Sequence, residues 1–228
     1  MPAIAFFDVD GTLMQGYSGY YTTLLLIQKK IMKKRRLLQA LFYKTISKIV
    51  TADIKKIYTI ACMDLAGMTL DQVLKIGEES FLKDVKKRLY IEALEKVKEH
   101  QRRGDKVYLV TSAPYMTIEH LADFLKVDGH YSAGPIIDYK KNPKGVLLKE
   151  VKTPIYFREG KIQAALDATA KHGVDLKDCY YYADSIDDTF LFEKVGHPFM
   201  VNPDSKLSKI GKQKNWPELH FTKMMGES

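Results

Sequence analysis

Two aspartates separated by one residue end the first apolar run of the chain. Residues 3 to 9, Ala-Ile-Ala-Phe-Phe-Asp-Val, predict a buried strand, and Asp8 and Asp10 lie at its end, directly before Gly11. Alternate residues of a strand lie on the same face, so the two carboxylates share a face. Like charges at a buried strand end raise each other's pKa unless a cation lies between them. The pair is therefore a candidate for metal binding and nucleophilic chemistry.

Other polar residues stand at the ends of later predicted elements. They are Thr111 and Ser112 after the apolar run 107–110, Lys161 at a helix start, and Asp184 and Asp188 after the run 180–183. In open α/β sheets, ligands bind at the carboxyl ends of the strands. We therefore expect these side chains to converge with the first two aspartates in one crevice, although they lie far apart in the sequence.

The residue types in this group favour a phosphate held by magnesium. Asp8, Asp10 and Asp184 offer hard oxygen donors without a nearby His or Cys, and this donor set suits Mg²⁺ rather than zinc or copper. The hydroxyl of Thr111 and the ammonium of Lys161 could donate hydrogen bonds to the phosphate oxygens that the metal does not bind. A carboxylate beside a phosphoryl group held by a metal can act as a nucleophile and form an aspartyl-phosphate.

The elements that must position these residues alternate between strands and helices. Further strands are predicted at 107–110, 180–183 and 198–201, helices at 91–103, 115–125, 161–172 and 187–195, and a β-hairpin within 131–154. This alternation is typical of an α/β domain with a parallel sheet. The tail after Lys212 is expected to be loosely held, although Trp216 and Phe221 could pack back on the core.

The segment between the first strand and residue 91 has a different pattern. Apolar residues recur at spacings of three and four from Tyr17 onward, and Asp53 and Leu70 stand at predicted helix starts. No clear strand pattern interrupts this segment. We therefore expect an α-helical cap of residues 16–90, inserted into a Rossmann-like parallel-sheet core of residues 1–15 and 91–228.

The composition excludes several classes of protein. A chain of 228 residues fits one large domain or a core with an insert. Two cysteines, Cys62 and Cys179, exclude a disulfide framework and a multi-cysteine zinc site, and they favour a reducing compartment. The N-terminus lacks the pattern of a signal peptide, and no stretch reaches 18 apolar residues. A cytoplasmic protein without stable membrane insertion is therefore expected.

The run Asp8-Val9-Asp10-Gly11-Thr12-Leu13 resembles the first motif of the haloacid dehalogenase superfamily of phosphohydrolases. The second, third and fourth motifs are similar to Val110-Thr111-Ser112, to Lys161 within Arg158-Glu159-Gly160-Lys161, and to Asp184-Ser185-Ile186-Asp187-Asp188. The helical insert and the run 196–204 resemble the phosphoserine-phosphatase-like subgroup. The resemblance extends over roughly residues 4 to 221 and implies a Mg²⁺-dependent phosphomonoester hydrolase.

The resemblance also implies a role for each residue. Asp8 would be the nucleophile, and Asp10 would protonate the leaving alcohol and then activate water. Mg²⁺ would be held by Asp8, the backbone carbonyl of Asp10 and Asp184, and Asp188 would support the metal shell. The residues that would hold the phosphoryl group are Thr111, Ser112 and Lys161.

The expected substrate is a small phosphorylated metabolite. Phosphoserine phosphatases of this subgroup carry a Glu shortly after the first motif, and this Glu meets the amino group of the substrate. The matching position here is about Tyr17, and no acid occurs between Asp10 and Asp53. Phosphoserine itself is therefore disfavoured.

The net charge of +8 lies between Tyr17 and His100, a stretch that contains a basic cluster of Lys29, Lys30, Lys33, Lys34, Arg35 and Arg36. Such a cluster is typical of a solvated helix end, but it could also steer anionic substrates or weakly contact acidic lipid head groups. Nucleic acid is not expected, because no RNA-binding motif accompanies it. Two alternatives to an enzyme stay open: a phospho-acceptor, and a binding module whose basic cap docks to an anionic surface. The oligomeric state is also open.

Overall fold

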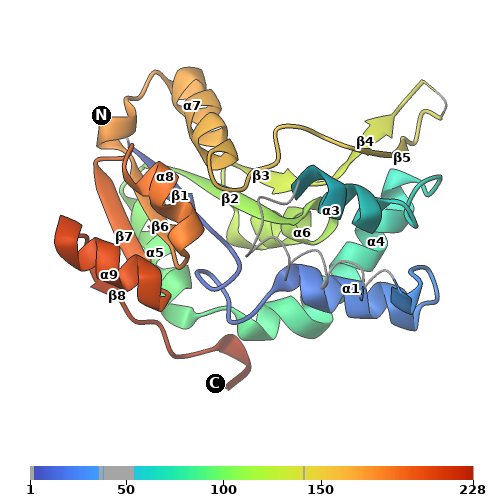
Figure 1. Cartoon of the computed structure of the whole chain (residues 1–228), viewed down its shortest axis with the longest axis horizontal. Coiled ribbons are helices and arrows are strands. Elements are labelled where there is room, and N and C mark those ends of the chain that lie inside the picture. The colour runs from blue at the N-terminus through green and yellow to red at the C-terminus, as the bar shows by residue number, and fades with distance from the viewer. Residues whose placement is uncertain (1–2, 36–37, 39–53, 141, 228) are drawn as a thin grey trace.

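The structure is a computed structural model that describes residues 3–35, 38, 54–140 and 142–227. Its centre is a sheet of six parallel strands in the order β3-β2-β1-β6-β7-β8 (Figure 1). The strands are β1 (Ile4–Phe7), β2 (Lys106–Pro114), β3 (Gly129–Ala133), β6 (Tyr180–Ala183), β7 (His197–Val201) and β8 (Glu218–Leu219). The predicted parallel α/β core is confirmed.

The strand register brings the predicted site residues to one edge of the sheet. Phe7, the last residue of β1, pairs with Leu109 of β2 and with Tyr182 of β6. The chain moves from β1 to β2 and β3 on one side, and β6 to β8 lie on the other side. The carboxyl ends of β1 and β6 therefore flank the point where the strand order reverses, and ligands bind at such a point in open α/β sheets.

Helices cover both faces of this sheet. Helices α5 (Ile91–Arg102) and α6 (Tyr115–Leu125) share one buried apolar cluster with β1 and β2. Helices α7 (Gly160–His172), α8 (Thr189–Phe192) and α9 (Ser205–Lys214) share a second cluster on the opposite face. The helices predicted at 91–103, 115–125 and 161–172 match α5, α6 and α7. The helix predicted at 187–195 is shorter, because a 3₁₀ turn at Ile186–Asp188 comes before α8.

In the described part of the segment 16–90, three α-helices gather at one end of the sheet (Figure 1). They are α1 (Ser18–Gln28), α3 (Ile54–Cys62) and α4 (Leu70–Ser80), and a π-helical turn (Phe81–Val85) and a 3₁₀ turn (Lys86–Arg88) lead back to the core. Helix α4 packs closely on α6, since a Cβ at Gly77 would lie 1.8 Å from the backbone oxygen of Met116. The predicted helix start at Asp53 lies outside the described residues.

A β-hairpin after β3 joins these helices to the core. Strands β4 (Pro135–Asp138) and β5 (Val146–Val151) pair antiparallel, so the predicted hairpin is present. Leu147 of β5 donates its N–H to Met68 O at 3.0 Å and accepts from Gly67 N at 2.9 Å. The Leu147 side chain is buried in the same apolar cluster as α1 and α4. The hairpin therefore packs with the inserted helices, and Figure 1 shows it reaching toward them.

Two residues of the basic cluster contact acidic residues. Lys29 Nζ lies 2.6 Å from Glu79 Oε2, and the backbone N–H of Lys33 donates to Asp64. Arg36 lies outside the described residues. Within the part of the chain that the structure covers, no helix combines the length and the apolar character needed to cross a membrane.

The tail is not loosely held, and Phe221 and Trp216 pack back on the core, which was the alternative that the sequence left open. Phe221 is buried in the apolar cluster beneath α5 and α6, and its backbone pairs with the side-chain amide of Asn202 at 2.9 and 3.0 Å. The carboxylate of Glu92 accepts the backbone N–H groups of Thr222 and Lys223. These contacts join residues far apart in sequence, and apolar burial at Phe221 offsets the entropy cost of ordering the tail.

The tail makes a first testable prediction. Phe221→Ala should lower the free energy of unfolding by about 3 kcal/mol, because it removes a buried ring and leaves a cavity. Urea unfolding followed by circular dichroism measures this change. Tyr139→Ala is the matched control, since the Tyr139 side chain is 57% exposed. Equal stability of the two variants would contradict the packed tail.

Candidate active site

Three carboxylates converge where the strand order reverses. Asp8 follows β1, Asp184 follows β6, and Asp188 ends the 3₁₀ turn after β6. One carboxylate oxygen from each residue lies within 4.8 Å of the others. Asp8 and Asp188 are buried, and the backbone N–H of Val9 donates to Asp8 Oδ1 at 2.8 Å. This convergence agrees with the positions of the three residues after predicted strands.

Gly11 allows the first and last of these segments to approach each other. Its φ is +84°, and a Cβ at this position would lie 2.2 Å from Asp184 Oδ2. Any other residue would therefore be strained and would displace the carboxylate. The neighbouring Thr12 hydroxyl donates to Asp184 Oδ1 at 3.2 Å and fixes its orientation.

Lys161 enters the cluster from the first turn of α7. Its Nζ lies 3.1 Å from Asp8 Oδ2 and 2.6 Å from Asp188 Oδ1, and it donates to the Tyr181 hydroxyl at 3.1 Å. Tyr181 in turn donates to Asp188 Oδ1. The Lys161 side chain is only 5% exposed, so these charge-assisted bonds act in a site that excludes water.

The cluster carries more negative charge than one ammonium neutralises. Burial, together with the charges of Asp188 and Asp10, raises the pKa of Asp8 to about 7, although Lys161 opposes this shift. Burial and the charges of Asp8 and Asp188 raise the pKa of Asp184 to about 8. Burial alone would lower the pKa of Lys161, but Asp188 and Asp8 outweigh it and raise that pKa.

The donor set fits a divalent cation. Asp8, Asp184 and Asp188 present only carboxylate oxygens, which are the ligands that Mg²⁺ prefers in proteins. The buried excess of negative charge, which raises the pKa of two of these acids, is the charge that such an ion would offset.

Asp10 lies next to this cluster but has a different partner. Its Oδ1 accepts the backbone N–H of Ser18 at 2.8 Å. Ser18 is the first residue of α1, so the carboxylate meets the positive end of the helix dipole. The first inserted helix therefore orients the Asp10 side chain beside the reaction centre.

Thr111 and Ser112 lie near the end of β2, which runs on to Pro114 and is longer than predicted. Thr111 is buried, and its hydroxyl accepts the backbone N–H of Ala113 at 3.1 Å. The Ser112 carbonyl accepts the hydroxyl of Tyr58 from α3. The second motif is thus held from the core and from the inserted helices.

Residues 5–193 match the haloacid dehalogenase-like hydrolase family. The chain belongs to this family. A phosphoserine phosphatase of Mycobacterium tuberculosis is 25% identical over 95% of this chain and 70% of its own length. A histidinol-phosphatase of Neisseria meningitidis is 26% identical over 97% of this chain and 100% of its own. A crystal structure of a Bordetella pertussis protein of unknown function has a TM-score of 0.83 at 24% identity, and the match covers 96% and 99% of the two chains. The predicted superfamily is confirmed.

Sequence reasoning missed two tyrosines of this hydrolase. Tyr181 lies within the predicted strand 180–183, and only its pairing with Lys161 and Asp188 across the fold gives it a role at the site. Burial raises the pKa of Tyr58 to about 12, and the charges of Asp10 and Asp8 add to this shift. Neither tyrosine belongs to a motif, and strand alternation is the one sequence signal that places Tyr181 on the face of α7.

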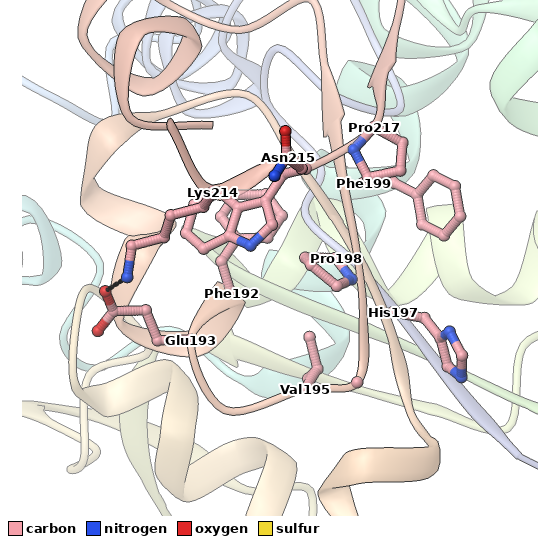
Figure 2. A pocket seen from close by; sticks show the side chains of 11 residues that line it. Phe192, Glu193, Val195, His197, Pro198, Phe199, Lys214, Asn215 and Pro217 are labelled. Atoms are coloured by element: carbon pink, nitrogen blue, oxygen red, sulfur yellow. Dashed lines mark hydrogen bonds and ion pairs between the residues drawn. The ribbon is translucent and has the colours of Figure 1, made fainter. Parts of the chain in front are cut away.

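A hollow of about 620 Å³ lies elsewhere on the hydrolase (Figure 2). It is lined by Phe192, Pro198 and Trp216 and by the ion pair of Lys214 with Glu193. It lies beside β7, α8 and the end of α9. Asp8, Asp184 and Asp188 are not among the residues that line it.

Proposed function

We propose that this hydrolase is a Mg²⁺-dependent phosphomonoesterase that acts on a small phosphorylated metabolite through an aspartyl-phosphate. The observation that carries the proposal is Lys161, which bridges Asp8 and Asp188 beside Asp184 at the end of the sheet. A buried carboxylate next to a fixed ammonium suits attack on an anionic phosphoryl group.

In the first half of the reaction, a carboxylate oxygen of Asp8 attacks phosphorus. The new acyl–phosphate bond forms as the ester P–O bond breaks. The carboxylic acid of Asp10 gives its proton to the leaving alkoxide, which departs as the neutral alcohol. The N–H of Ser18 holds Asp10 Oδ1 during this transfer.

In the second half, Asp10 acts as the base. Its carboxylate takes a proton from water as the water oxygen attacks phosphorus of the aspartyl-phosphate. The acyl–phosphate bond breaks, which releases inorganic phosphate and restores the carboxylate of Asp8. Attack by water needs no further residue as a nucleophile.

Three polar groups would hold the transferred phosphoryl group. They are the hydroxyls of Thr111 and Ser112 and the ammonium of Lys161. Asp8, the backbone carbonyl of Asp10, and Asp184 would hold Mg²⁺, and Asp188 would support them. When bound, the ion would offset the negative charge of the phosphoryl oxygens.

Two relatives support this proposal, because the names of both describe phosphatases.

A test uses the purified chain and a generic aryl phosphate. Hydrolysis is expected in MgCl₂ and should stop in EDTA, because the carboxylates would then lack their counter-ion. Restored activity after addition of excess Mg²⁺ is the control. Hydrolysis that continues unchanged in EDTA would contradict the metal requirement.

The substrate makes a further testable prediction. Tyr17 lies next to Ser18, whose backbone N–H donates to Asp10 Oδ1, and it offers a phenol where a carboxylate would bind an amino group. Phosphoserine should therefore have a kcat/KM at least about tenfold below the best member of a panel of phosphorylated metabolites. Steady-state kinetics on phosphoserine, histidinol phosphate and sugar phosphates measure this. Efficient phosphoserine turnover would show that another acid, such as Asp53 or Glu78, reaches the substrate.

A further inference from the structure

Asp204 makes two contacts with the segment that carries the metal-binding carboxylates. It lies just after β7 in the run Asn202-Pro203-Asp204. Its backbone N–H donates to Asp184 O at 2.8 Å, and its Oδ2 accepts the backbone N–H of Ile186 at 2.8 Å. The segment 184–188 is therefore bound to Asp204 at its first and third residues.

The other oxygen of Asp204 is bound to a helix. Oδ1 accepts the backbone N–H groups of Lys206 and Leu207 at 2.9 and 2.8 Å and caps the N-terminus of α9. Helix α9 is itself fixed on the sheet. Leu207 is fully buried, and a Cβ at Gly211 would lie 2.1 Å from the sulfur of Met200. One carboxylate thus bridges a rigid helix and the catalytic loop.

We infer that Asp204 is a positioning residue of the metal centre. Asp184 and Asp188 stand at the two ends of a five-residue loop, and both must approach Asp8 for their oxygens to converge. The bridge from α9 through Asp204 holds the middle of that loop in place. The inference rests on the proposed function in one respect, namely that the carboxylate cluster binds Mg²⁺.

A simpler role for Asp204 is that of a helix cap alone, and two substitutions separate the roles. Asn and Ser cap helices about as well as Asp, so either keeps α9 capped. In Asp204→Asn the oxygen that caps α9 is kept, but an NH₂ group replaces the oxygen that accepts the N–H of Ile186. Two donors then face each other, and no hydrogen bond forms between them. In Asp204→Ser one hydroxyl replaces two oxygens and cannot serve both partners. Both variants lose the side-chain bond to Ile186 and keep the bond to the helix, and the backbone bond to Asp184 O remains in each.

A matched control is available in the same chain. Asp175 Oδ1 accepts the backbone N–H of Lys177 at 2.8 Å and caps the 3₁₀ turn Leu176–Asp178, which precedes β6. Asp175 stands at the amino end of that strand, and the carboxylate cluster follows its carboxyl end. Asp175→Asn changes the same chemistry without touching the catalytic loop.

The experiment measures Mg²⁺ binding rather than turnover. Isothermal titration of the full chain with MgCl₂ gives the dissociation constant, and thermal melting in EDTA reports the fold of the metal-free protein. We expect Asp204→Asn and Asp204→Ser to weaken Mg²⁺ binding about tenfold, as the loss of supporting contacts around metal ligands does. Their melting in EDTA should match that of Asp175→Asn, which should bind Mg²⁺ as the wild type does.

The outcomes separate this inference from the proposed function. Wild-type protein that binds no Mg²⁺ would overturn the metal centre and the positioning role together. Wild-type protein that binds Mg²⁺, with both Asp204 variants binding it equally tightly, would overturn the positioning role and leave the proposed function standing. Equal weakening in Asp175→Asn would also overturn the role, because the effect would then follow from any lost cap.

Discussion

Replacing Asp8 by Asn is expected to reduce turnover of the best substrate by at least about 10⁴-fold, as loss of an enzymatic nucleophile does. The amide has the shape of the carboxylate but cannot form an acyl–phosphate bond. Its oxygen can still accept the N–H of Val9, which Asp8 Oδ1 accepts at 2.8 Å. Burial raises the pKa of Asp8 to about 7, so removal of this charge should not unfold the protein.

The measurement compares steady-state turnover of wild-type and Asp8→Asn protein at equal Mg²⁺. Melting curves establish that both are folded. Asp167→Asn is the matched control: Asp167 lies on the exposed side of α7, where it accepts a hydrogen bond from Gln163 at 2.7 Å. Residual activity of Asp8→Asn above a few per cent of wild type, about 10⁻² in rate, would remove Asp8 as the nucleophile.

The convergence of the carboxylates could be predicted because Asp8 and Asp184 stand directly after predicted strands. Asp8, Thr111 and Asp184 each follow a short apolar run, and parallel strands bring their carboxyl ends to one edge. That inference needs no knowledge of strand order. The family resemblance then assigned roles, and the structure brings Lys161 from a helix start to Asp8 and Asp188.

The contacts that could not be predicted connect distant segments without a local pattern. The tail is held because Phe221 is buried and Asn202 binds the Phe221 backbone. No local sequence pattern indicates that these two residues are partners. Pairing of Leu147 with residues 67 and 68 is equally non-local. Helix α9 had a local signal in the cap Asp204, but its short amphipathic pattern follows the strand too closely to be distinguished from a loop.

Replacing Lys161 by Met is expected to lower both the stability of the protein and its turnover. The variant side chain is apolar and one heavy atom shorter, and Asp8 and Asp188 lose their shared ammonium. Breaking a buried ion pair by removing one partner destabilises a protein by about 3–5 kcal/mol, because an uncompensated charge is left in the interior. Lys161 also lowers the pKa of Asp8 and Asp184, so both values should rise further in the variant.

The sign of the pH dependence follows from these raised values. A carboxylate whose pKa is higher in the folded state contributes stability below its unfolded pKa, and this contribution is lost as the pH rises through the folded pKa. The folded values of Asp8 and Asp184 are about 7 and about 8, against 3.8 unfolded. The stability deficit of Lys161→Met should therefore be larger at about pH 8 than at about pH 5, because it grows only as the pH passes the wild-type pKa of Asp8, about 7.

Urea unfolding of wild type and Lys161→Met at both pH values, in EDTA and in MgCl₂, measures this effect. Mg²⁺ should recover part of the lost stability, since it supplies positive charge to the same carboxylates. Turnover should still fall by at least about 10³-fold, because the transferred phosphoryl group has lost its fixed ammonium. The control is Lys171→Met on the exposed last turn of α7. The electrostatic account of the site would be wrong if the two proteins had the same free energy of unfolding in EDTA at the higher pH. The ammonium would then not offset the buried charge.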